Sequence, residues 1–139
     1  MILPTTQRVP RRAGTAVDLP YELPHLLTQK GVEVTISNTG ESLGNARNLP
    51  FFVGTAIAYG MDKEEALKTI TAHAAKALGV DDRLGTLTVG KDATLFVSEG
   101  DALDYSGNIL THAFISGKQV VLDNKQQALY KRYSDKYGH

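Results

Sequence analysis

The residue types that most often do chemistry, histidine and the carboxylates, are scattered along this chain. Its four histidines are far apart and include no H-x-H pair: His25, His73, His112 and His139. A histidine holds a metal only together with further ligands close by. Asp81 and Asp82 are adjacent, but Arg83 follows them and offsets their charge in what reads as a solvated turn. We therefore expect packed or surface histidines and a solvated charge cluster, and no metal site in this chain.

The composition argues against several classes of function. The 139 residues suit a single domain, and fifteen basic residues balance fifteen acidic ones. A net charge of zero with no long basic run argues against a nucleic-acid partner. No stretch approaches the ~20 apolar residues that cross a bilayer, so we expect a soluble protein with no membrane partner, whose compartment stays open. The absence of cysteine excludes disulfides, thiolate metal sites and a cysteine nucleophile.

Periodicity predicts a helical first half. Three prolines predict a loop over residues 1–20, and the apolar spacing that follows predicts further elements. These are a helix at 21–29, a strand at 32–36, a buried helix at 48–59 and a capped helix at 62–78. Asp62 and Glu65 fit a capping box at the start of the last of these helices.

Glycines punctuate the second half. Gly79 is placed to cap the helix in a left-handed conformation, and Gly85 and Gly90 bracket a short alternating strand at 86–89. Strands are also predicted at 93–98, 112–116 and 119–122, with Gly117-Lys118 as a turn, and together they make a small antiparallel layer. A final helix follows Asn124. Its Leu129, Tyr130, Tyr133 and Tyr137 share one flank, which predicts packing against the body.

The helix exit and glycine-punctuated ribbon GVDDRLGTLTVGKDATLFV, at 79–97, resemble the C-terminal signature of the amidohydrolase superfamily. NARNLP at 45–50 and GMDKEEAL at 60–67 fit the same order, and the likeness is to the imidazolonepropionase-like branch of metal-dependent hydrolases. It implies an α/β fold: the C-terminal fragment of a (β/α)₈ barrel plus part of the accompanying small β-sandwich. Residues 1–82 would give the last barrel strand and its helices, 83–123 the sandwich part, and 124–139 a C-terminal helix.

The resemblance also implies a chemistry that this chain does not complete. Metal-dependent members activate water on one or two divalent ions held by an H-x-H pair, a carboxylated lysine, further histidines and an aspartate that ends the last barrel strand. Asn38 or Thr39 stands in place of that aspartate, and Glu41 lies just beyond it. These three are the rim candidates for catalysis. Arg47 and Asn48 would contact substrate or cap the next helix. A divalent metal, zinc, is expected in a full-length active relative.

Two functions are consistent with these residues. The chain is either the C-terminal part of a hydrolase of C–N bonds in non-peptide or peptide-like amides, inactive by itself, or a non-catalytic binding or assembly module on the same scaffold. A half-barrel leaves strand edges that pair readily with other chains. We therefore expect association with a missing N-terminal barrel portion or self-association, with a small-molecule substrate in the parent protein.

Overall fold

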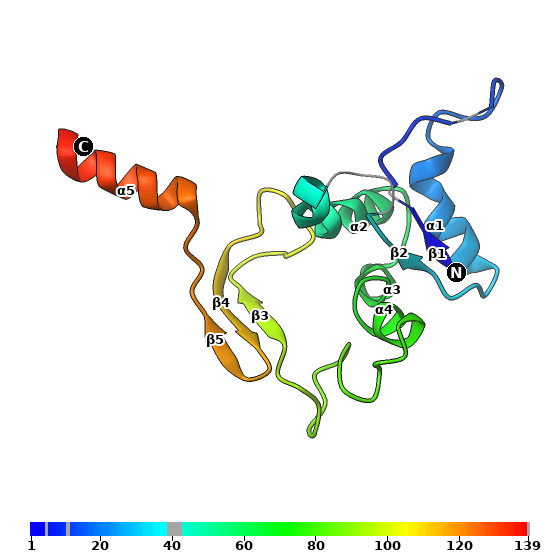
Figure 1. Cartoon of the computed structure of the whole chain (residues 1–139). Helices are drawn as coiled ribbons and strands as arrows, with labels where there is room; N and C mark the ends of the chain where they lie inside the picture. Colours follow the sequence, from blue (N-terminus) through cyan, green and yellow to red (C-terminus); the bar gives the residue numbers. More distant parts are fainter. Residues whose placement is uncertain (5, 11, 39–42, 139) are drawn as a thin grey trace.

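The computed structural model describes residues 1–4, 6–10, 12–38 and 43–138. Three parts follow one another along the chain (Figure 1). The helical body (residues 1–80) packs helices against a short parallel sheet, the β-layer (residues 95–120) is an antiparallel sheet, and a terminal helix extends away from both. No helix within this described part combines the length and apolar character that crossing a bilayer requires.

The elements of the helical body are β1 Ile2–Leu3, α1 Leu19–Gln29, β2 Thr35–Ile36, the 3₁₀ helix η1 Leu43–Asn48, α2 Leu49–Ala58, α3 Lys63–Lys68 and α4 Ala72–Ala77. The β-layer consists of β3 Leu95–Ser98, β4 Leu110–Ile115 and β5 Lys118–Val120, and the terminal helix is α5 Lys125–Tyr137. The helices predicted at 21–29 and 48–59 are thus confirmed to within a residue or two.

The prediction of a loop over residues 1–20 is wrong for the first residues of the chain, which form a strand. Ile2 and Leu3 form β1, which runs parallel to β2 with Ile2 opposite Thr35 and Leu3 opposite Ile36. The backbone amide of Ser37 donates to the Leu3 carbonyl at 2.9 Å. Two apolar residues before a proline gave no periodic signal, because the partner that makes them a strand lies more than thirty residues away.

The core of the helical body is built around β2. Val34 and Ile36 are almost fully buried, and α2 contributes Phe52, Val53 and Ala56 to the same cluster. Leu3 joins from β1. Burying a side chain of this size contributes roughly 1.5–3 kcal/mol relative to leaving it in water, so the strand and the helix above it stabilise each other.

The continuous helix predicted at 62–78 is wrong, because the structure interrupts it between α3 and α4. The Thr69 hydroxyl donates to the Ala66 carbonyl at 2.6 Å, and the Thr71 hydroxyl donates to the Leu67 carbonyl at 2.8 Å. Such bonds compete with the helical backbone ladder and bend the chain. The predicted start is confirmed, since the Glu65 amide donates to the Asp62 carboxylate at 3.0 Å.

The β-layer has the strand order β3-β4-β5, antiparallel throughout. Its tight turn lies at Ser116-Gly117, one residue earlier than predicted, and both residues have positive φ (49° and 76°). Two left-handed residues in sequence suit the right-handed twist of a hairpin. The strand predicted at 86–89 is wrong. That region consists of turns, and an ion pair connects their two ends. The Arg83 guanidinium donates to the Asp92 carboxylate at 2.7 and 3.1 Å.

Helix α5 begins at the predicted residue, but its side chains are not packed against the body as predicted. The Gln127 amide donates to the Asn124 side chain at 2.9 Å, and the Gln127 side chain accepts from the Asn124 amide at 3.2 Å. The expected burial of its aromatic flank is not observed, because Tyr130 is 75% exposed and Tyr137 62%. No residue of α5 is buried.

The docking loop (residues 99–109, between β3 and β4) ties the β-layer to the helical body. Leu103 is buried in the core cluster, and a Cβ at Gly54 of α2 would lie only 2.2 Å from the Leu103 carbonyl oxygen. The two ends of the loop approach each other closely, because a Cβ at Gly100 would lie only 2.3 Å from the Gly107 carbonyl oxygen. An ion pair of 2.8 Å between Lys63 and Asp101 fixes its flank.

Replacing Gly54 by alanine tests this contact. In a free helix Gly→Ala is worth about 1 kcal/mol of added stability, whereas overpacking against a backbone carbonyl costs about 1–3 kcal/mol. We expect Gly54→Ala to lower the free energy of unfolding, measured by urea denaturation, and to shift the Leu103 amide resonance. Ala58→Ser, at an exposed position one turn further along the same helix, is the control and should leave the Leu103 amide resonance unchanged. A more stable Gly54→Ala variant would contradict the contact.

Candidate functional site

The candidate site is the rim at which β1 and β2 end. The two strands are parallel, so the residues that follow them emerge at the same edge. Asn38 follows β2 after Ser37, as predicted from the sequence, and Thr6 and Gln7 follow β1. Thr39 and Glu41, the other two rim candidates, lie outside the described residues.

Hydrogen bonds hold the described rim residues onto α2. The Thr6 hydroxyl is buried and donates to the Phe52 carbonyl at 3.0 Å. The Gln7 amide donates to the Thr55 hydroxyl at 3.2 Å, and that hydroxyl donates to the Phe51 carbonyl at 3.0 Å. Sequence analysis missed Thr6 and Gln7, because only the pairing of β1 with β2 brings them to this edge.

Arg47 and Asn48 lie at the end of η1, where the chain enters α2. Arg47 is exposed. Asn48 occupies the position before α2 with helical dihedrals (φ −88°, ψ −1°), and its side chain makes no capping hydrogen bond. The capping alternative is therefore not observed at Asn48, while contact of these two residues with a substrate stays a prediction.

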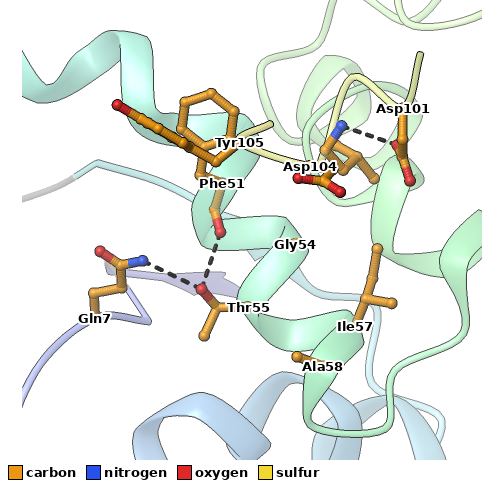
Figure 2. A pocket seen from close by; sticks show the side chains of 10 residues that line it. Gln7, Phe51, Gly54, Thr55, Ile57, Ala58, Asp101, Asp104 and Tyr105 are labelled. Carbon is orange, nitrogen blue, oxygen red and sulfur yellow. Dashed lines mark hydrogen bonds between the residues drawn. The ribbon is translucent and has the colours of Figure 1, made fainter. Parts of the chain in front are cut away.

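A cavity of about 600 Å³ opens beside the rim, between α2 and the docking loop (Figure 2). The Phe51 and Tyr105 rings meet edge to face with centroids 5.0 Å apart. Asp101 and Asp104 line the loop side, and Gln7 connects the cavity to the rim. The site thus places aromatic surface, an amide and two carboxylates around one open space.

The ionisation of Asp101 suits it to anchoring the loop. Its hydrogen bond with Lys63, followed by the one it accepts from the Leu103 amide, holds the pKa of this carboxyl below its ordinary value, and the pKa of Lys63 is raised by the same pair. A general acid at neutral pH needs a carboxyl whose pKa is raised. Asp101 therefore stays ionised and acts as the charged half of an ion pair.

His25, His73 and His112 lie on three different elements, α1, α4 and β4. His73 has its Nδ1 atom 3.0 Å from the Val34 carbonyl, which fits the predicted packing role beside β2. The His25 Nε2 atom lies 2.9 Å from the Gln29 side-chain nitrogen within α1. His112 is exposed on β4, and His139 lies outside the described residues. Arg83 was expected to offset Asp81 and Asp82, but its ion pair is with Asp92.

The described rim residues do not fit a zinc ion. Zinc in proteins takes thiolate, imidazole or carboxylate ligands, and Thr6, Gln7, Ser37 and Asn38 offer only hydroxyls and amides. Across residues 1–4, 6–10, 12–38 and 43–138, no three histidine, aspartate or glutamate side chains gather in a way that could hold a metal.

Known proteins resemble this chain over most of its length. Residues 22–124 match the model of the Amidohydrolase family. The imidazolonepropionase of Thermoplasma volcanium is 32% identical over an alignment of 117 positions, which covers 80% of this chain and 29% of that protein. The crystal structure of an amidohydrolase from Thermotoga maritima superposes with a TM-score of 0.66 at 27% identity, over 79% of this chain and 29% of that one.

A more distant structure shares the fold. An adenosine deaminase from Xanthomonas campestris with bound zinc superposes with a TM-score of 0.54 at 22% identity, over 79% of this chain and 32% of that one. In each case the chain spans about three tenths of its relative's length. The zinc belongs to that deaminase, whose remaining two thirds have no counterpart among these 139 residues.

Removing the partner of Asp101 tests the anchor that shapes the cavity. A folded-state pKa below the unfolded value means that the pair stabilises the protein above the unfolded pKa and that this contribution is lost as the pH falls through the folded pKa. We expect Lys63→Gln to raise the pKa of Asp101 toward its ordinary value, measured by NMR titration of the side-chain carboxyl carbon. Lys68→Gln, which removes the partner of Glu65, should leave Asp101 unchanged. Equal Asp101 midpoints in all three proteins would refute the anchoring role.

Proposed function

The chain belongs to the amidohydrolase family, in its imidazolonepropionase-like branch, and we propose that it forms the C-terminal part of a hydrolase of C–N bonds in non-peptide or peptide-like amides. The observation that carries the proposal is the sheet at the centre of the helical body. Among the described residues, β2 pairs only with β1, yet its Ile36 and the preceding Val34 are among the largest fully buried side chains of the structure. Such a strand suits the last position of a barrel whose preceding strands come from elsewhere.

The division of the chain follows from the same proposal. On this proposal residues 1–82 supply the end of the (β/α)₈ barrel, residues 83–123 supply part of the composite β-sandwich, and residues 124–139 form a C-terminal helix. The β-layer supports this division, since Phe96 and Ile115 on one face and Val97 on the other are each about half exposed or more. A sheet with apolar side chains on both faces is suited to the interior of a larger structure.

The chemistry would come from the rest of the protein. An asparagine amide is neither an acid nor a base at neutral pH, so Asn38 cannot take the proton of an attacking water as a carboxylate does. A divalent metal, such as the zinc bound by the Xanthomonas deaminase, would have to be held by residues outside the described part of this chain. This chain's residues would form one wall of the site: Thr6, Gln7 and Ser37 fix the strand ends, and η1 carries Arg47 at the entry to α2.

A second function is favoured by one residue. Asn38 or Thr39 stands where the resemblance places the strand-end aspartate, and either substitution suits a binding or assembly module that keeps the scaffold without the hydrolysis. On that alternative, the rim residues Asn38, Arg47 and Asn48 form a contact surface. The two proposals share the fold and the need for a partner, and they differ in whether the completed protein turns over a substrate.

Reconstitution separates the two proposals. The chain is purified alone and also co-expressed with an N-terminal amidohydrolase portion, taken first from the reading frame upstream of Met1 and otherwise from the Thermoplasma relative. We expect the chain alone to bind zinc below stoichiometry and to hydrolyse nothing. The complex should elute as one species with about one or two zinc ions per pair, and should open the ring of imidazolone propionate, the substrate class named by the relatives, or cleave a related amide.

The two proposals predict different results for this reconstitution. A stable complex with stoichiometric zinc and chelator-sensitive hydrolysis supports the enzyme. A stable complex that binds zinc poorly and stays inactive, even with Asn38→Asp, supports the assembly module. Failure of every N-terminal portion to associate, with the chain folded and its β-layer protected from hydrogen exchange, would refute both, because each requires the open strand edges to be covered.

A further inference from the structure

The first segment of the chain carries an excess of positive charge. Residues 1–17 contain three arginines, Arg8, Arg11 and Arg12, and no aspartate or glutamate, although the chain as a whole is neutral. In the structure Arg8 is half-buried and Arg12 is exposed. Among the ion pairs between described residues, none involves either of these two side chains. Their guanidinium groups are therefore suited to binding an anion from outside the chain.

A turn after Arg12 helps to bring both arginines to one cavity. The Thr15 amide donates to the Arg12 carbonyl at 3.3 Å, and Gly14 between them has a φ of 80°. A positive φ at the third position of a four-residue turn favours glycine, which adopts it without a steric cost. Arg8, Arg12 and Thr15 all line a cavity of about 320 Å³ against α1, which we call the arginine cavity.

The remaining walls of the arginine cavity are apolar. The first segment contributes Val9 and Pro10, and α1 contributes Leu19, Pro20 and Leu23. The two prolines have a fixed φ, so part of the wall is ordered before any ligand binds. Ligand pockets in proteins typically combine mostly apolar walls with a few polar groups that orient the ligand. The cavity is therefore suited to a small molecule with an anionic head and an apolar body.

The lining residues favour a carboxylate over a phosphate as the anionic head. A guanidinium group donates two parallel hydrogen bonds to a carboxylate, and it binds a phosphate in the same way. The apolar walls decide between them, because inorganic phosphate has no apolar surface to bury there. A polyphosphate or a nucleic acid would need more basic residues than a neutral chain offers. An organic carboxylate uses both the guanidinium groups and the apolar walls.

The arginine cavity lies beside the candidate site and is separate from it. Gln7 of the rim lines the cavity next to Phe51, and it also lines a second cavity of about 530 Å³ together with Arg8. Arg8 in turn lines both this second cavity and the arginine cavity. The three spaces therefore follow one another along the first segment, and neither Asp101 nor Asp104 lines the arginine cavity.

We propose that the arginine cavity binds a small organic carboxylate. Its head is held by Arg8 and Arg12, with the Thr15 hydroxyl as a further donor, and its apolar body packs on Leu19 and Pro20. This inference goes beyond the proposed function, because binding requires neither a metal nor turnover. It is measured on the 139-residue chain alone, so its failure would leave the hydrolase proposal standing, and the reverse also holds.

The experiment is an NMR titration of the isotope-labelled chain at low salt with four probes. Hexanoate should shift the side-chain N–H signals of Arg8 and Arg12 and saturate with a Kd of about 1 mM or below. Hexanamide has the same apolar body without the charge, and acetate has the charge without the body. These two, and inorganic phosphate, should each bind about tenfold or more weakly than hexanoate.

Variants locate the binding. Arg8→Gln and Arg12→Gln should each weaken hexanoate about tenfold or more, and Leu19→Ala should weaken hexanoate while leaving acetate unchanged. Arg132→Gln removes the same charge from an exposed position of α5 and is the matched control, which should bind like the wild type. Circular dichroism checks that each variant is folded. The absence of saturable hexanoate binding, equal binding of hexanamide or phosphate, or equal weakening by Arg132→Gln would each overturn the proposal.

Discussion

The packing of α2 on β2 is the interaction on which the rest of the structure depends. Val34 and Ile36 enter the core from the strand, and Phe52, Val53 and Ala56 enter it from the helix, while β1 adds Leu3 at the strand's edge. The same helix receives the hydrogen bonds of Thr6 and Gln7 and the carbonyl of Leu103. Because one helix contacts the core, the rim and the docking loop, a displacement of α2 would move all three together.

The Gly54 contact explains how two weakly connected parts keep a fixed geometry. Residues 81–94 form turns and bends, so the β-layer depends on the docking loop for its position. Leu103 buries apolar surface in the core, and the Lys63–Asp101 ion pair orients the docking loop. The absence of a side chain at Gly54 allows the Leu103 carbonyl to approach α2. An exposed ion pair contributes little by itself. The buried leucine is therefore the main source of stability here, and the pair sets the orientation in which it is buried.

How much the sequence predicted depends on whether the cause was local. The caps at Asp62, Gly79 and Asn124 were predicted because each is decided by hydrogen bonds or dihedrals within a few residues. β1 and the burial of Leu103 were missed because their partners lie more than thirty residues away. In the candidate site, the position of Asn38 after β2 followed from the strand pattern. Thr6 and Gln7 did not, since only the fold brings them there. The break at Thr69–Thr71 arises from hydroxyl bonds that apolar periodicity does not register.

The uncovered surfaces differ in kind, and each makes a different demand on whatever covers it. An open strand edge such as that of β2 presents backbone donors and acceptors, which are satisfied by another strand of a barrel. The aromatic flank of α5 instead presents exposed tyrosine side chains, Tyr130, Tyr133 and Tyr137, which only side-chain packing can cover. An N-terminal barrel portion, as proposed above, would meet the first of these demands by adding strands beside β2.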